Sequence, residues 1–78
     1  MAASTPPRVT ITNRIRELRF AHRQMTQQDL AERVGVSRQT INAIEGGKYS
    51  PSLEAAFQIA RVFGVPLDTV FQCEIARK

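Results

Sequence analysis

The chain has 78 residues, a length that suits one small domain and leaves no room for two. A single cysteine and a single histidine provide neither an intramolecular disulfide nor the several ligands of a zinc site. The sequence shows no secretory leader and no apolar stretch near the roughly 20 residues that span a bilayer. We therefore expect a cytoplasmic protein with no membrane association, no cofactor and no metal.

The positive charge of the chain is unevenly distributed. Residues 1–48 contain eight lysines or arginines against four acidic residues, whereas residues 49–78 contain three of each. The formal net charge of +4 and the isoelectric point of about 10.2 therefore originate in the first part of the chain. Such a balance is typical of proteins that bind nucleic acids, although scattered arginines can also serve only to keep a chain soluble.

Residues 1–12 are expected to form an N-terminal tail that can end in a short strand. From residue 9 to residue 12, apolar side chains and threonines alternate with the period of a strand. Residues 72–78 form the corresponding C-terminal tail, in which Cys73 and Ile75 continue an alternation that starts at Phe71. The two segments could pair within one chain or between two chains. Because an isolated two-stranded ribbon is marginal in water, frayed ends explain the pattern equally well.

The region between the tails, residues 13–71, begins with a helix. Thr12 or Asn13 can cap the start of this helix, and Ile15 and Leu18 follow with helical spacing. We expect these two apolar side chains in the core.

A second helix is indicated from about residue 27. Thr26 and Asp29 have the spacing of a capping box, in which a hydroxyl and a carboxylate bind each other's backbone N–H groups. Gly35 fits the left-handed position that ends many helices. The apolar face between these points consists of Leu30, Ala31 and Val34.

The third helix, residues 38–46, is expected to carry the function. Ser37 is suited to cap it, and Ile41 and Ile44 then face inward. The outward face is polar, and the major groove of DNA admits a helix whose arginine or amide side chains pair with base edges. Simple solvation is the other explanation of such a face, but the cap, the glycine and the apolar spacing together favour DNA. The outward side chains are Arg38, Gln39, Asn42 and Ala43.

A loop and two further helices complete the domain. Lys48 and Tyr49 follow the third helix, where a DNA backbone would pass, and either side chain could bind a phosphate. Tyr49 could equally pack on the fourth helix. Ser52 caps that helix and Gly64 ends it, and a last short helix starts after Pro66. The expected buried side chains of these two helices are Ala56, Phe57, Ala60, Phe63, Leu67, Val70 and Phe71.

From residue 13 to residue 71 the sequence resembles the Cro and phage-repressor type of helix-turn-helix domain, also called the XRE type. The resemblance is carried by Ile15, Leu18 and Arg19 of the first helix, by MTQQDLAERVGVSRQTINAIEGGKYSPSLE, and by IARVFGVPLDTVF. It implies an all-α fold, a compact lambda-repressor-like domain of five helices. Proteins of this type regulate transcription by binding operators as dimers.

The resemblance also implies roles for individual residues. Gln27 and Lys48 occupy phosphate-contacting positions, and Arg38, Gln39 and Ala43 occupy base-facing positions. Some relatives have a long polar side chain at the position of Ala43. The alanine side chain cannot form a hydrogen bond with a base edge, so this position offers fewer direct polar contacts. Arg19 and Glu45 occupy the positions of an internal salt bridge. The complete set of expected DNA-binding positions is Gln27, Ser37, Arg38, Gln39, Thr40, Asn42, Ala43, Lys48 and Tyr49.

The function predicted from the sequence is sequence-specific regulation of transcription. A homodimer would bind an inverted-repeat operator in double-stranded DNA through residues 38–46, and its interface could be the last helix or the terminal strands. The alternative is an antitoxin-type interaction module that binds a toxin partner and regulates its own synthesis. We do not expect an enzyme, because no nucleophile with a base and no pair of catalytic acids can be recognised.

Overall fold

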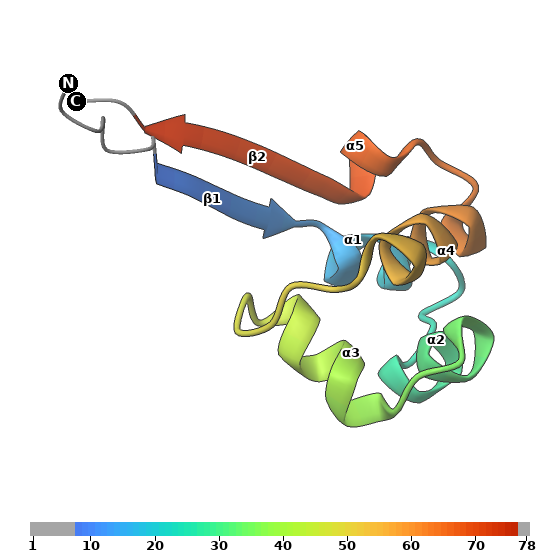
Figure 1. The fold of residues 1–78 in the computed structure, drawn as a ribbon. Coiled ribbons are helices and arrows are strands. Elements are labelled where there is room, and N and C mark those ends of the chain that lie inside the picture. The colour runs from blue at the N-terminus through green and yellow to red at the C-terminus, as the bar shows by residue number, and fades with distance from the viewer. Residues whose placement is uncertain (1–7, 77–78) are drawn as a thin grey trace, which may run out of the picture.

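The computed structural model describes residues 8–76, and the N-terminal tail expected before residue 8 lies outside this range. Five short helices form a body from which a two-stranded ribbon projects (Figure 1). The fold is therefore mostly helical, in agreement with the predicted five-helix domain, and the two terminal strands that the sequence allowed form a small sheet. In chain order the elements are β1 (Arg8–Asn13), α1 (Ile15–Ala21), α2 (Gln27–Val34), α3 (Arg38–Glu45), α4 (Leu53–Phe63), α5 (Leu67–Val70) and β2 (Phe71–Ala76).

Every helix contributes apolar side chains to one core. The largest fully buried side chains are those of Ile15, Leu30, Ile41, Ile44, Ile59 and Val70. The prediction that Phe57 is buried was wrong, since 51% of this residue is exposed, whereas Ile59 is completely buried. The inward positions of α4 are Ala56, Ile59, Ala60 and Phe63. They follow the spacing of a helical stripe, which leaves Phe57 beside it.

The helix starts mostly follow the predicted caps. Thr26 Oγ1 accepts a hydrogen bond from the Asp29 N–H at 2.9 Å, and Asp29 Oδ2 accepts one from the Thr26 N–H at 3.2 Å, so the capping box is confirmed. Ser37 and Ser52 cap α3 and α4 as predicted. For α1 the prediction was wrong by a residue: Arg14 occupies the N-cap without a side-chain cap bond. Asn13 Oδ1 instead accepts from the Ile15 N–H at 3.1 Å.

The capping box predicts a pH-dependent contribution to stability. The hydrogen bond from the Thr26 backbone N–H, with a smaller effect of the Thr26 side chain, lowers the pKa of Asp29 below its ordinary value. The contribution is thus complete above the unfolded-state pKa of about 3.9 and is lost as the pH falls through the lower, folded-state pKa. We expect Asp29→Asn to lower the melting temperature near pH 7 and to have little effect in strong acid.

Circular dichroism melts of both proteins between pH 7 and pH 2 would measure this difference. Glu32→Gln is the matched control, because Glu32 is an exposed acid later in α2 that accepts from the Gln28 side chain instead of from a backbone cap. A gap between wild type and Asp29→Asn that stays constant over the whole pH range would contradict the prediction.

The terminal segments form an antiparallel ribbon within the chain, which decides between strands and frayed ends. Val9 pairs with Ile75, and Ile11 pairs with Cys73. The ribbon is anchored at its inner end, where the Arg14 N–H donates to the Val70 carbonyl at 2.9 Å and Phe71 packs against the core.

None of the helices within residues 8–76 has the length and apolar character needed to cross a membrane.

Candidate nucleic-acid interface

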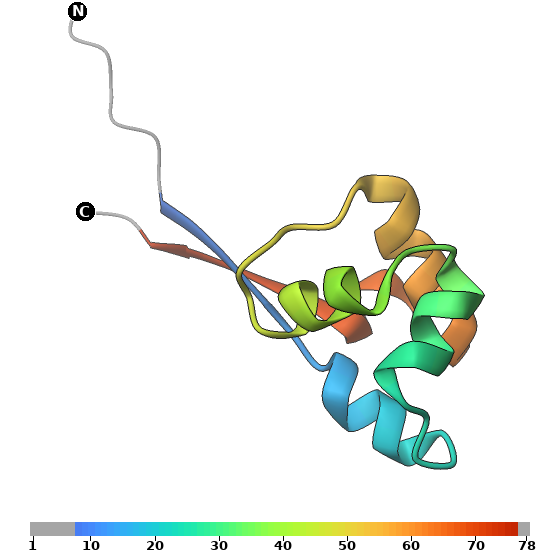
Figure 2. The same cartoon turned by 90° about the horizontal axis from the view of Figure 1, so that it is seen from below.

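Two helices of the body, α2 and α3, form a compact pair joined by a tight turn. Gly35 ends α2 with φ of +85°, a left-handed conformation that glycine adopts without the steric cost of a Cβ. Ala31 of α2 is completely buried, and its small side chain suits a close approach of the two backbones. Seen from below in Figure 2, α3 lies on the outer surface of the body. A helix in this position can be inserted into a groove.

The exposed face of α3 carries the predicted polar side chains. Ile41 and Ile44 are 0% and 2% exposed and fix the inner face of the helix. Arg38, Gln39 and Asn42 are exposed, and Thr40 and Ala43 are partly buried. The helix therefore presents one forked guanidinium and two amides to the outside, next to the small methyl group of Ala43.

Ser37 and Thr40 take part in the local structure of the helix start. Ser37 Oγ accepts from the Thr40 N–H at 3.1 Å, and the two hydroxyl oxygens lie 2.9 Å apart. These bonds hold the first turn of α3, from which Arg38 and Gln39 project. The hydroxyl groups of Ser37 and Thr40, which are predicted to bind DNA, therefore also stabilise the start of α3.

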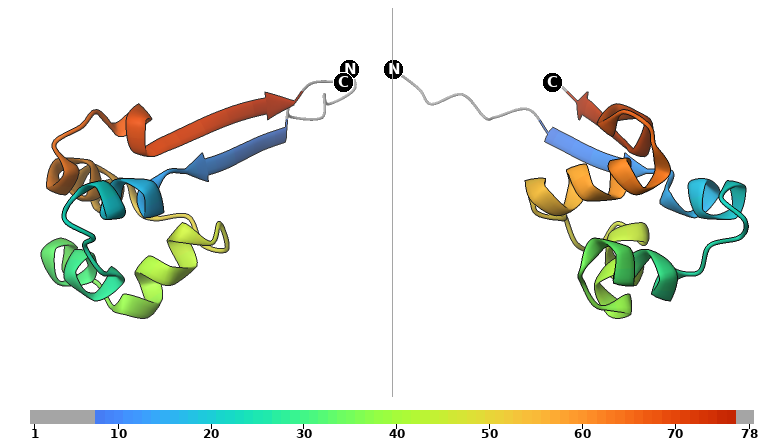
Figure 3. Two further views of the ribbon diagram at one scale, coloured as in Figure 1. Left: turned by 180° about the vertical axis from the view of Figure 1, so that it is seen from behind. Right: turned by 90° about the vertical axis from the view of Figure 1, so that its right-hand side faces the viewer.

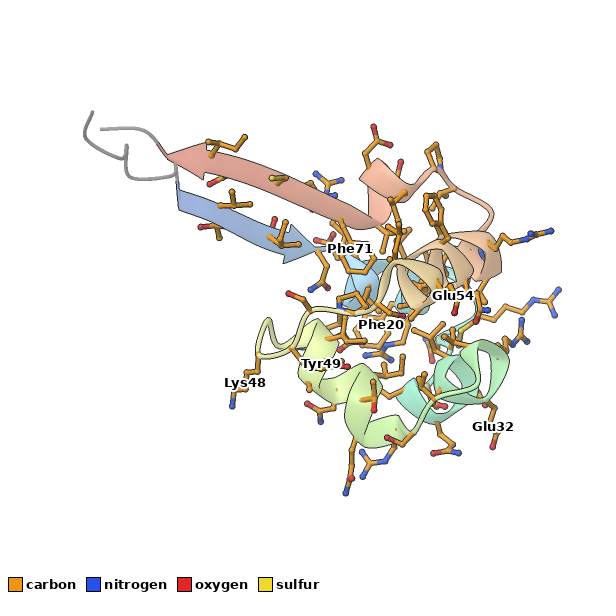
Figure 4. All side chains as sticks on the ribbon, in the orientation of Figure 1. Phe20, Glu32, Lys48, Tyr49, Glu54 and Phe71 are labelled. Atoms are coloured by element: carbon orange, nitrogen blue, oxygen red, sulfur yellow. The ribbon has the colours of Figure 1, made fainter. Side chains whose placement is uncertain are left out.

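The loop after α3 places the two further predicted residues at the end of the same helix. Gly47 has φ of +74°, and the following Lys48 N–H donates to the Ala43 carbonyl at 2.9 Å, which closes the last turn. Lys48 is exposed and points away from the body (Figure 4). Tyr49 is 55% exposed, and it lines a cavity of about 30 Å³ together with Ile11 and Phe71 of the ribbon. Tyr49 therefore lies near the inner end of the ribbon.

The last residue of α3 belongs to a buried ion pair. Arg19 Nε contacts Glu45 Oε2, and Arg19 Nη2 donates to Glu45 Oε1 at 3.2 Å. The side chains of the two residues are only 9% and 10% exposed. Arg19 Nη1 also donates to the Met25 carbonyl at 2.8 Å. The pair between Arg19 and Glu45 that the resemblance implied is thus present, and it connects α3 with α1 and with the segment before α2.

Gln27 takes part in the same network. Its Nε2 donates to Glu45 Oε1 at 3.1 Å, and its side chain is partly buried. This bond fixes the orientation of the side chain that the resemblance assigned to a phosphate contact. The amide group has a second N–H, which remains chemically suited to bind an oxygen acceptor.

Asn13 connects the ribbon to α3, a role that the sequence analysis missed. Its Nδ2 donates to the Ile44 carbonyl at 3.0 Å and lies 3.4 Å from the Glu45 carbonyl. Helix ends leave their last carbonyl groups without partners inside the helix, and Asn13 binds two of them. The residues lie more than 30 positions apart, so no local sequence signal could indicate the contact.

An open polar cleft of about 910 Å³ lies beside the C-terminal end of α3. Its lining includes Asn42 and Gly46 of the α3 region, Arg14 and Arg16 at the start of α1, and Glu74 of the ribbon. Arg14 and Arg16 were not among the predicted DNA-binding residues, because helical spacing places them outside the core without indicating which residues lie opposite. The packing of α1 brings these two exposed arginines to the same cleft as Asn42, one of the predicted DNA-binding residues.

A second and third helix that pack around a glycine turn, with a polar outer face on the third, define a helix-turn-helix domain. The family model described as helix-turn-helix, of the XRE type, matches residues 15–70, and the chain belongs to this family. It is 54% identical over 59 residues to an uncharacterised HTH-type transcriptional regulator of Methanocaldococcus jannaschii. That match covers 76% of this chain and 88% of the relative.

Two further similarities extend this picture. The chain is 38% identical over 56 residues to the cryptic phage CTXphi transcriptional repressor RstR of Vibrio cholerae, which covers 72% of this chain and 50% of the repressor. The crystal structure of a Bacteroides fragilis protein assigned to DNA binding superposes with a TM-score of 0.70 at 30% identity. That comparison covers 81% of this chain and all of the other.

Proposed function

We propose that this protein is a sequence-specific DNA-binding regulator of transcription that binds an inverted-repeat operator as a homodimer. The observation that carries the proposal is the exposed polar face of α3, held on a frame of buried contacts. The relatives are named as transcriptional regulators, which favours this function over a toxin-binding module.

The exposure of α3 supports the proposed base-reading positions. Arg38 is exposed at the start of the helix, where a guanidinium can bind both acceptors of guanine. Gln39 and Asn42 can each bind adenine with two hydrogen bonds. Ala43, with the methyl group of Thr40, is suited to contact the methyl group of a thymine, and it leaves one base position without a direct polar contact.

Cations and donors around the helix would bind phosphates and hold its orientation. Lys48 and Tyr49 follow α3, and Gln27 lies at the start of α2. Arg14 and Arg16 extend this set on the other side of the cleft. Such contacts carry no sequence information, but they fix the register of the reader helix and make the affinity depend on salt.

Dimerisation is proposed because one helix of this size reads few base pairs. A single module buries limited surface on DNA, and two copies double the contact. For a two-fold dimer of this motif, the half-sites are expected about 34 to 36 Å apart.

The proposal is tested by selecting binding sites from randomised duplex DNA at about 150 mM salt, where weak phosphate binding is reduced. We expect enrichment of one inverted repeat, and loss of binding when either half-site is scrambled. A scrambled duplex of the same length is the control. Enrichment of no sequence, with equal binding to all duplexes, would contradict the proposed function.

A further inference from the structure

The outer part of the ribbon has an apolar face that is not covered by the described part of the chain. Val9, Ile11 and Ile75 are 57%, 45% and 53% exposed, and Cys73 is exposed as well. Val9 lies opposite Ile75 and Ile11 lies opposite Cys73. Because residues directly opposite in an antiparallel pair project from the same side, these four side chains form one face.

This face continues toward the loop after α3. Phe71 has the same parity as Cys73 and Ile75, and it packs against the core. At this inner end, Ile11, Phe71 and Tyr49 line one small cavity. Figure 3 shows the loop after α3 on the same side of the body as the projecting ribbon. We call Val9, Ile11, Tyr49, Cys73 and Ile75 the ribbon patch.

The ribbon needs support at its outer end. A two-stranded ribbon alone is marginal in water and becomes stable when its apolar face is covered. The inner end has such cover from the core, but the outer residues extend beyond the helical body (Figure 1). A partner that covers the ribbon patch would therefore stabilise the ribbon and bury the five exposed side chains of the patch.

We propose that a second copy of this chain covers the ribbon patch, with the two ribbons packed face to face about a two-fold axis. This inference rests on the proposed function, since it identifies the interface of the proposed homodimer. A two-fold interface places the same surface on both subunits, so the surface must be compatible with itself. The five residues of the ribbon patch carry no charge, which satisfies this condition in a chain of net charge +4. The opposite ribbon face includes Glu74, whose carboxylate would be repeated in the interface.

The position of the ribbon patch suits an operator with two half-sites. Tyr49 belongs to the loop that directly follows α3, so a partner on the ribbon patch would lie beside the C-terminal end of the reader helix. The two-fold axis would then pass close to that end. Both α3 helices would lie on one side of the dimer, as binding to adjacent major grooves requires.

The area of the ribbon patch sets the expected strength of the dimer. A six-residue strand is about 20 Å long and two paired strands are about 10 Å wide, which gives a face of roughly 200 Å². A stable interface buries about 800 Å² on each partner. The dimer should therefore be weak without DNA, with a dissociation constant in the micromolar range or above, and it should become dominant on an operator that binds both subunits.

Sedimentation of the full chain at a series of concentrations tests the proposal. The variant Ile11→Lys places a charge in the ribbon patch, and Thr10→Lys places the same charge on the adjacent residue of the opposite face. Thr10 pairs with Glu74, so the control lysine lies beside an opposite charge. We expect self-association to be weakened on the order of tenfold or more by Ile11→Lys, because burial of an unpaired charge is unfavourable, and to be unchanged by Thr10→Lys. Circular dichroism checks that both variants fold.

Cys73 provides a second measurement on the unmodified protein. Because the thiol lies within the ribbon patch, a short bismaleimide should join two chains through their Cys73 side chains at concentrations where dimers form. Thr10→Lys should retain this product, and Ile11→Lys should reduce it. Failure of the wild-type dimer to react through Cys73 would overturn the face-to-face arrangement even if Ile11→Lys unfolds the ribbon.

The proposed dimer interface and the proposed sequence-specific DNA binding can be tested independently of each other. Ile11→Lys should still bind a single half-site but lose the joint occupancy of both. Equal association of wild type and Ile11→Lys, or a wild type that is monomeric both free and on DNA, would overturn the interface and leave the proposed base reading intact. A failure to enrich any DNA sequence would instead overturn the proposed function, while the association measurements would still decide the interface.

Discussion

Replacing Glu45 with alanine is expected to lower the free energy of unfolding by about 3 to 5 kcal/mol, the usual cost of leaving one partner of a buried ion pair. Arg19 is only 7% exposed, and its guanidinium contacts Glu45 through two nitrogens. Without the carboxylate, the charge remains buried with the Met25 carbonyl as its remaining acceptor. Urea unfolding followed by circular dichroism measures the change.

Two further variants distinguish the cost of leaving one charge unpaired from the net contribution of the ion pair to the free energy of unfolding. Arg19→Met with Glu45→Leu removes both charges and keeps the volume, so it should cost much less than Glu45→Ala alone. Glu32→Ala is the matched control, because Figure 4 places Glu32 at the outside of α2. Its effect should stay within about 0.5 kcal/mol, as for most surface substitutions. Equal unfolding free energies of wild type and Glu45→Ala would disprove the role of the pair.

The network around Glu45 also connects the stability of the fold with the proposed DNA-reading face of α3. The carboxylate accepts from Arg19 of α1 and Gln27 of α2, and Asn13 binds the backbone carbonyls of the same helix end. The elements β1, α1 and α2 thus all contact the C-terminal end of α3. Rigid support of this kind is needed because a base-reading side chain must keep its position within a fraction of an ångström.

The features that could be predicted from the sequence depend on neighbouring residues. The caps at Thr26 and Ser37 and the glycine at position 35 have local signatures, since a cap bonds to residues two or three positions away. The inner face of α3 followed from the spacing of Ile41 and Ile44. At α4 the helical stripe includes Ile59 and leaves Phe57 beside it, so the prediction of a buried Phe57 was wrong.

The features that could not be predicted depend on contacts between distant segments. The alternation near both ends of the chain fits strands and frayed ends alike. What decides between them is the anchoring of the ribbon by Val70 and Phe71 at the other end of the chain. The link from Asn13 to α3 and the position of Arg14 and Arg16 beside the cleft arise from the same packing. No pattern within a short window contains this information.

Replacing Gln39 with alanine is expected to reduce the preference for the selected operator over single-base variants by about 1 to 3 kcal/mol per half-site, the discrimination of one good bidentate contact. In the proposed dimer the loss occurs twice, so an operator changed symmetrically in both halves should show up to about twice that effect, since separated positions are roughly additive. Gln39 is exposed and forms no part of the core, so the fold should be retained. Fluorescence anisotropy with the operator and its single-base variants measures the preference.

Lys48→Ala is the contrasting variant, because Lys48 lies outside α3 and can bind a phosphate without reading a base. It should weaken binding to all duplexes alike and reduce the slope of affinity against salt by about one phosphate contact per subunit. Gln39→Ala should leave that slope nearly unchanged, because an amide carries no charge that releases counterions. The two variants therefore separate base reading from phosphate binding in the same titration. If both substitutions weakened all duplexes equally and changed the salt slope equally, α3 would not be the element that reads the sequence.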